Sequence, residues 1–330
     1  MKVTFFGTRG SIPVADPEFS RFGGNTSCVM LTFETGRIAF LDAGTGLRKA
    51  GRHMHARGVT QHDNLFIGLS HTHWDHIQGF PFFEPAYDAR RTITVALPGR
   101  TGSRLDLESV FTTQMQQDFF PVPLTGMGSR VHFWQPATGG LDLPAPVRVE
   151  TSRHPHPGGA YGYRVHEGPR SVVYVTDVEH GNRIVPEVVA LARGADLLIH
   201  DAQYTPDELA SHRGWGHSSW EQAVEVALEA KVKRLALFHH DPDHDDAFLA
   251  RVELEAQRLF SEAFMAREGL NWNEVRAEYA QLEHDDSAPT PGASTRSTSS
   301  PTAASSSIAL PVRRSNAVKT SSRRASSHRP

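Results

Sequence analysis

The chain has 330 residues, of which 38% are hydrophobic and 22% are charged, and its formal net charge at pH 7 is −3. That length allows one domain with a large core plus appendages, whereas no segment approaches the roughly 20 apolar residues of a membrane span. Of the 34 basic residues, 7 lie in residues 287–330, where there are no acids, so residues 1–286 hold the other 27 against all 37 acids. An acidic body argues against broad nucleic-acid binding, which depends on basic surface, although the basic tail could add weak contacts.

Short β-like runs and helical patterns alternate over most of the chain. Strands are predicted at residues 3–6, 28–33, 37–41, 65–69, 92–96, 131–134, 148–151, 162–165, 171–176, 197–200 and 234–238. Helical periodicity is found at residues 46–57, 105–117, 182–193, 218–230 and 247–266, and Ser218 or Ser219 can cap the fourth of these helices. Strands and helices mixed through one long segment predict an α/β (α+β) protein whose sheets are covered by helices.

Two segments are predicted from composition. Residues 1–283 form the folded domain, and residues 284–330, which are rich in Ser, Thr, Pro and Arg, form a disordered tail because they cannot offset the entropy of ordering. Residues 308–312 within the tail could be a docking motif, but a featureless linker is the simpler interpretation. The only cysteine, Cys28, excludes an internal disulfide and is expected in the core. The N-terminus shows no signal-peptide pattern, so we expect a cytoplasmic protein with no membrane partner.

The most informative feature is a cluster of metal-ligand side chains directly after the apolar run 65–69. Residues 70–76 read Ser-His-Thr-His-Trp-Asp-His, which places His71, His73, Asp75 and His76 within six positions. Imidazole and carboxylate groups are the ligands that zinc and similar divalent ions prefer. Buried without metal, each of these groups would need its own polar partner. The cluster therefore predicts a metal site.

Two ions need more ligands than this box supplies, and candidates stand at the ends of other predicted strands. His154 and His156 precede the strand at 162–165, Asp177 ends the run 172–176, and His239 and His240 end the run 235–238. Loops at strand ends are where a rigid sheet presents functional groups. These residues are therefore expected to join the box.

The ordered set of motifs resembles the metallo-β-lactamase superfamily, in its ribonuclease Z-like phosphodiesterase branch, which includes cyclic-nucleotide phosphodiesterases. The resemblance runs from the N-terminal strands to Asp241, and it rests on the following motifs: Gly7-Thr8-Arg9-Gly10-Ser11, Gly23-Gly24-Asn25-Thr26-Ser27-Cys28, Leu41-Asp42-Ala43-Gly44, the His-x-His-x-Asp-His box, Gly162-Tyr163-Arg164, Thr176-Asp177, Gly216-His217-Ser218-Ser219 and Phe238-His239-His240-Asp241. It implies an αββα sandwich of two mixed β-sheets flanked by helices, and possibly a homodimer, as relatives in this branch often are.

The resemblance also implies two divalent ions, zinc first, with manganese or iron as alternatives. One ion would be held by His71, His73 and His156, and the second by Asp75, His76 and His239, with Asp177 bridging them. Spacing favours His156 over His154 and His239 over His240; the neighbour in each pair could orient a ligand or touch substrate. Asp42 and Asp201 would support ligands, although a turn-forming role for Asp42 is almost as good an interpretation. His53, His55, His62, His212 and His244 are interpreted as solvated surface residues.

A dinuclear site of this kind favours hydrolysis. Two ions can clamp the attacking and leaving oxygens of an in-line displacement, so Asp75 and His217 are the predicted catalytic residues. In this branch the residue matching His217 contacts the scissile phosphate and can protonate the leaving oxygen. Its position before a predicted helix fits an anion-binding role. The alternative is a histidine that only satisfies turn contacts.

The substrate is predicted to be a small phosphodiester such as a 3′,5′-cyclic nucleotide. No Gly- and Lys-rich arm for holding transfer RNA is found, and residues 118–124 are aromatic and proline-rich, which suits base stacking. Phe80, Phe82, Phe83 and Trp215 could extend that wall, although at least half of them are expected in the core. The alternatives are a ribonuclease Z-like transfer-RNA 3′-processing endonuclease, a thioester or lactam hydrolase, and a non-catalytic nucleotide-sensing scaffold.

Overall fold

The computed structural model describes residues 1–56, 64–99, 105–136, 140–141 and 146–272, all within one compact unit. The predicted tail at 284–330 and its candidate docking motif at 308–312 lie outside the described residues, as does His62. Among the described helices, none has both the length and the apolar character needed to cross a bilayer.

The first sheet contains six strands from the N-terminal half of the chain. In chain order and in spatial order they are β1 (Lys2–Gly7), β2 (Cys28–Thr32), β3 (Ile38–Leu41), β4 (Asn64–Gly68), β5 (Thr92–Ala96) and β6 (Arg130–Trp134). The β1–β2 and β2–β3 pairs are antiparallel, whereas β3 to β6 run parallel. The sheet is therefore mixed, and its parallel strands end at a common edge.

The second sheet repeats this plan in reverse. Its seven strands, in chain order, are β7 (Gly140–Leu141), β8 (Val147–His154), β9 (Ala160–Glu167), β10 (Arg170–Val175), β11 (Leu197–Asp201), β12 (Leu235–Phe238) and β13 (Ala263–Met265). Strands β7 to β10 pair antiparallel, and β10 to β13 pair parallel. The C-terminal ends of β10 and β12 therefore lie at the same edge.

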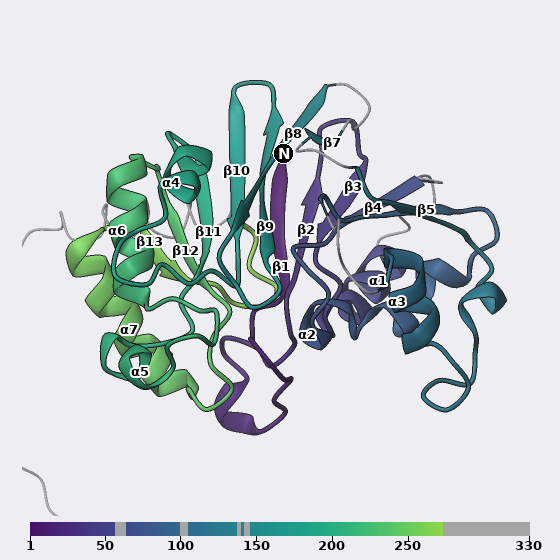
Figure 1. Cartoon of the computed structure of the whole chain (residues 1–330), viewed down its shortest axis with the longest axis horizontal. Coiled ribbons are helices and arrows are strands. Elements are labelled where there is room, and N and C mark those ends of the chain that lie inside the picture. The colour runs from purple at the N-terminus through teal and green to yellow at the C-terminus, as the bar shows by residue number, and fades with distance from the viewer. Residues whose placement is uncertain (57–63, 100–104, 137–139, 142–145, 273–330) are drawn as a thin grey trace, which may run out of the picture. The chain divides into compact units, whose positions relative to one another are not determined.

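Helices cover the outer face of each sheet (Figure 1). The α-helices are α1 (Gly46–Ala56), α2 (Trp74–Ile77), α3 (Leu107–Gln114), α4 (Pro186–Ala192), α5 (Pro206–Ser211), α6 (Trp220–Ala230) and α7 (Asp246–Leu259). Short 3₁₀ turns occupy Pro17–Phe19, Phe80–Phe82, Glu84–Tyr87 and Leu124–Gly126. In Figure 1, α1 and α3 accompany the first sheet, and α4, α6 and α7 accompany the second.

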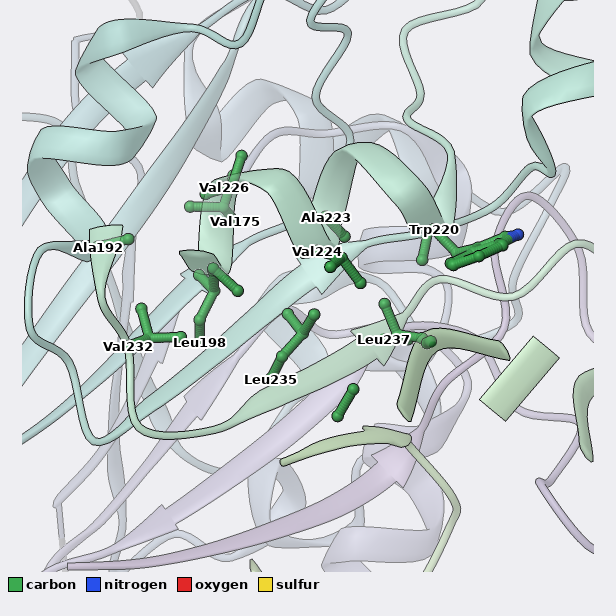
Figure 2. Close-up of a cluster of buried hydrophobic side chains, with 14 of the residues drawn as sticks. Val175, Ala192, Leu198, Trp220, Ala223, Val224, Val226, Val232, Leu235 and Leu237 are labelled. Carbon is green, nitrogen blue, oxygen red and sulfur yellow. The ribbon is translucent and has the colours of Figure 1, made fainter. Parts of the chain in front are cut away.

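Three apolar clusters connect these layers. Alternate residues of a strand point to opposite faces, so Val173 and Val175 of β10 join the cluster beneath the outer helices, whereas Val172 and Tyr174 join the cluster between the sheets. Figure 2 shows the outer cluster of the second sheet, where Val224 of α6 packs near Leu235 and Leu237 of β12. A third cluster lies between the first sheet and its helices. The predicted αββα sandwich is confirmed, and Cys28 is buried in the core.

All eleven predicted strands are present, but several predicted helix bounds were wrong. The pattern at 247–266 predicted one long helix, whereas α7 ends at Leu259 and residues Ala263–Met265 form β13, which pairs with β12. The helix predicted at 182–193 begins only at Pro186, which occupies its first turn, where the missing N–H of proline costs nothing. Ser219, one of the two predicted caps, does cap α6, and it accepts a hydrogen bond from the backbone N–H of Gln222.

Candidate metal centre and active site

The candidate site forms where strand ends of the two sheets meet. The first sheet supplies the histidine box, which follows β4 and runs into α2. The second sheet supplies His156 after β8, Asp177 after β10 and His239 after β12. The structure thus brings together all seven predicted ligands, which fall into two groups sharing Asp177.

The first group contains three imidazoles around one oxygen of Asp177. Its members are His71, His73, His156 and Asp177, whose ligand atoms all lie within 4.8 Å of one another. Asp177 Oδ2 is 3.7 Å from His71 Nε2 and 3.8 Å from His156 Nε2. His73 Nδ1 lies 3.0 Å from His156 Nε2.

The second group gathers around the other oxygen of Asp177. Its members are Asp75, His76, Asp177 and His239, and all four are buried. Asp177 Oδ1 lies 3.2 Å from Nε2 of His76 and 3.2 Å from Nε2 of His239. Asp75 Oδ2 is 3.0 Å from the former nitrogen and 3.2 Å from the latter. Asp177 thus presents one oxygen to each group, as a bridging carboxylate would.

Backbone geometry turns these side chains toward the centre. Asp42, Asp177 and His239 each follow the last residues of a strand, and each has a positive φ, at 61°, 56° and 62°. Residues other than glycine rarely adopt this left-handed region, and such strained positions concentrate at functional sites. The reversal at each strand end directs a polar side chain inward.

The donor set fits cations better than it fits a cation-free pocket. Within the described part of the chain, Nε2 of His71 and Nε2 of His76 are buried and have no hydrogen-bond partner. His76 donates its Nδ1 hydrogen to Asp42, and its Nε2 faces the carboxylates of Asp75 and Asp177. Burial alone would lower the pKa of His76, but those carboxylates raise it well above its usual value. Positive charge is therefore favoured here, and divalent ions would supply it.

A single buried carboxylate orients one ligand of each group. Asp42 Oδ2 accepts hydrogen bonds from His76 Nδ1 at 2.7 Å, from Tyr174 Oη at 2.7 Å and from Ser70 Oγ at 2.8 Å. Ser70 Oγ in turn accepts from His71 Nδ1 at 3.0 Å. Both imidazoles consequently present Nε2 to the centre. Asp42 therefore contacts one ligand candidate directly and the other through Ser70, a residue that the sequence analysis did not single out.

The sequence analysis also did not identify two further groups that hydrogen-bond to the predicted metal ligands. Gln203 Oε1 accepts from His239 Nδ1 at 3.0 Å, while Gln203 Nε2 donates to Asp241 Oδ2 at 3.1 Å. The backbone N–H of Ser11 donates to Asp75 Oδ2 at 3.0 Å. The only sequence signals were the position of Gln203, two residues after Asp201, and the N-terminal Gly-Thr-Arg-Gly-Ser motif.

His217 lies at the edge of the second group, paired with Asp201. Its Nδ1 donates to Asp201 Oδ2 at 2.8 Å, and its ring stacks on His239 with centroids 5.0 Å apart. Burial alone would lower the pKa of His217, but the Asp201 carboxylate outweighs it and raises the pKa to about 9. Asp201 also accepts from the backbone N–H of Asp177 at 3.0 Å. The pair can therefore hold a proton close to the centre at neutral pH.

The neighbouring histidines have other contacts. His154 donates from Nε2 to the carbonyl of Thr176, the residue before Asp177, and so supports that strand end. His240 donates from Nε2 to Ala266 O and packs edge-on against Phe22. The prediction that His244 is solvated was wrong, because its ring is buried, stacks on Phe248 and pairs with Glu208. His212 is half-buried and stacked on Tyr204.

Of the four rings that could extend the predicted aromatic wall, two belong to the core. Phe80 and Phe83 are fully buried beneath α1 and α3. Phe82 and Trp215 are exposed. This division matches the expectation that at least half of these rings pack inside the protein.

The sandwich, with its pair of His/Asp groups at the strand ends, has the architecture of the metallo-β-lactamase fold. Residues 37–240 match the family model described as "Beta-lactamase superfamily domain". The chain therefore belongs to the β-lactamase superfamily.

Relatives agree with this assignment. A protein named Ribonuclease Z from Picrophilus torridus is 36% identical over 104 residues. This match covers only about a third of the relative (32%) and 32% of this chain. Ribonuclease Z from Natronomonas pharaonis is 27% identical over 82% of this chain and 96% of that protein. The metallo-beta-lactamase fold protein YhfI from Bacillus subtilis has the same fold, with a TM-score of 0.59 and 23% identity over 82% of this chain and 98% of that chain.

Proposed function

We propose that the protein is a dinuclear metal-dependent phosphodiesterase. The single observation that carries this proposal is the placement of His217, whose Nδ1 lies 2.8 Å from Asp201 Oδ2, beside two ligand groups that share Asp177. Thioester hydrolysis by a dinuclear site does not need a fixed proton donor, because a thiolate leaves without a proton. Cleavage of a phosphodiester with an alkoxide leaving group does.

In this proposal, seven residues would bind the metal ions and two groups would transfer protons. His71, His73 and His156 would hold one ion, and Asp75, His76 and His239 the other, with Asp177 between them; zinc is our first candidate. When bound, the two ions would neutralise phosphate charge and lower the pKa of water. As the oxygen of the attacking water bonds to phosphorus, the Asp75 carboxylate, fixed by the Ser11 N–H, takes one proton from that water. His217 donates its proton to the leaving oxygen, while Asp201 keeps the imidazole in place.

The substrate class rests on two opposing observations. Relatives that match along most of the chain bear the name Ribonuclease Z, which favours the RNA-processing interpretation over the small phosphodiester that the sequence alone favoured. The exposed rings of Phe82 and Trp215 keep a small nucleotide as the second candidate, because aromatic surfaces bind isolated bases. We therefore place an RNA 3′-processing activity first.

A substrate panel on metal-analysed protein tests the proposal. Precursor transfer RNA, 3′,5′-cyclic nucleotides, bis(p-nitrophenyl) phosphate and a thioester should be compared, with His217→Ala as the control. We expect cleavage of phosphodiesters, with the RNA preferred, and no thioester turnover. Thioester hydrolysis that survives His217→Ala would contradict the proposal. Protein with two metals bound that is inert toward every substrate would instead support a sensing scaffold.

A further inference from the structure

The loop that carries His217 also presents an exposed tryptophan, two residues earlier in the chain. Trp215 is 62% exposed, so burial in the core does not explain it. Exposed aromatic side chains are the surfaces on which nucleobases stack in proteins that bind single-stranded nucleic acid. The question is whether this ring is held in place or is free to move.

The backbone on both sides of Trp215 is clamped by one carboxylate. Glu179 accepts the N–H of Gly214 on Oε1 at 2.8 Å and the N–H of Gly216 on Oε2 at 2.9 Å. Both glycines have positive φ, at 85° and 93°, and a Cβ at Gly216 would lie 2.1 Å from His156 Nδ1. The two bonds fix the direction in which the intervening side chain leaves the loop.

The ring itself is braced by a line of aromatic contacts that leads to His217. Trp215 packs edge-on against His212, with centroids 4.8 Å apart, and His212 stacks on the buried Tyr204 at 4.4 Å. His212 Nδ1 also donates to Glu208 O at 2.7 Å. Tyr204 then packs edge-on against His217 at 5.9 Å. Trp215 is thus pre-organised relative to the proposed proton donor.

We propose that Trp215 stacks on the nucleobase attached to the leaving oxygen, and so determines specificity on that side of the scissile phosphate. This inference rests on the proposed phosphodiesterase function. Because His217 would give its proton to the leaving oxygen, the nucleoside bonded to that oxygen would lie on the side of the site formed by this loop, whose Gly216 carbonyl contacts His156. A ring already ordered before binding loses little entropy when a base stacks on it.

The test uses a dinucleoside monophosphate, adenylyl-adenosine, and two analogues that each lack one of its bases. Product analysis with wild-type protein identifies the leaving nucleoside. Trp215→Ala should lower kcat/KM for the intact compound on the order of 5- to 150-fold, and should lower it far less for the analogue without the leaving-side base. Trp215→Phe should retain most of the activity, and His212→Ala should give a weaker loss with the same substrate dependence.

Leu254→Ala on α7 is the matched control, because Leu254 is 60% exposed and lies outside the candidate site. It should leave all three rates unchanged. Equal losses for Trp215→Ala on all three substrates, or a loss that follows the other base, would overturn the stacking role while leaving the phosphodiesterase intact. If wild-type protein with bound metal cleaves none of the three and no other phosphodiester, the proposed function fails and the stacking role fails with it.

Discussion

Asp42 Oδ2 accepts a hydrogen bond from Nδ1 of His76 at 2.7 Å, and both side chains are fully buried. The same carboxylate reaches His71 through Ser70. We therefore expect Asp42→Ala to lower metal affinity 10- to 100-fold, the usual cost of losing a group that orients a metal-binding histidine. Metal titration followed by elemental analysis measures the change.

Tyr174→Phe is the matched comparison, because it removes one hydrogen bond to Asp42 and leaves the carboxylate in place. Its metal affinity should fall much less than that of Asp42→Ala. Equal metal content in wild-type protein and Asp42→Ala would contradict the supporting role of Asp42.

Gln203→Leu should loosen the second ligand group. The amide oxygen fixes the imidazole of His239, and leucine of similar size cannot accept that hydrogen. We expect roughly one of two metal equivalents to be lost at limiting metal. Gln257→Leu serves as control, since Gln257 donates to Ala263 O near the end of α7 and should keep both equivalents. An unchanged stoichiometry in Gln203→Leu would remove Gln203 from the site.

His217→Ala should reduce cleavage of dinucleotides 10²- to 10⁴-fold but reduce cleavage of bis(p-nitrophenyl) phosphate much less. The reason is that p-nitrophenolate leaves without needing a proton, whereas an alkoxide needs one. The ratio of the two losses is the measurement, with bound metal checked in each sample. A similar loss on both substrates would indicate that His217 holds metal or structure instead.

Removing metal should both stop activity and destabilise the fold. Ions that bind only the folded state stabilise it by mass action, and the cation-free site leaves two buried imidazole nitrogens without partners. Chelator-treated protein is expected to melt several degrees lower, and added zinc or manganese should restore both the Tm and turnover. Thermal unfolding that is unaffected by chelation, in protein shown to have lost its metal, would speak against this coupling.

Low pH should weaken the hydrogen bonds of Asp196, which lies far from the candidate metal site. Asp196 accepts hydrogen bonds from Lys233 Nζ at 2.7 Å and from the Ser171 N–H at 2.8 Å. Burial alone would raise the pKa of Asp196, but these bonds lower it below its usual value of about 3.9. A lowered folded-state pKa means that the stabilisation is present above the unfolded-state pKa and is lost as the pH falls through the folded-state pKa.

Asp196→Asn should therefore cost about 0.5–1 kcal/mol of unfolding free energy at pH 7, a modest value because Lys233 is largely exposed. The difference from wild type should shrink as the pH falls below about 4. Urea unfolding at pH 7 and pH 3 tests both statements. A difference that grows in acid would reverse the sign of the argument.

The sequence predicted those parts of the site that depend on contiguous residues or strand ends. The box from His71 to His76 follows β4 directly, so its clustering is local. The supporting contacts of Gln203 and Ser11 could not be predicted, because they depend on how loops from distant segments meet at the strand ends. His244 was assigned to solvent because its neighbours are acidic, yet Glu208 from α5 and Phe248 of α7 enclose it.

The predicted helix bounds were wrong for a similar reason. The apolar positions through residue 265 continue a helical pattern, but pairing with β12 converts Ala263–Met265 into a strand. Such tertiary contacts outweigh local propensity. Strands such as β1, β3 and β12 were more predictable because both of their faces are buried, so that their apolar runs are nearly continuous.

The division of the ligands between the two sheets determines when the metal site can form during synthesis of the protein. The first sheet contributes His71, His73, Asp75 and His76, and the set is completed only when β12 delivers His239. A nascent chain that stops short of this strand cannot assemble the second ligand group. The two-ion chemistry proposed above therefore cannot begin until translation of the domain is nearly finished.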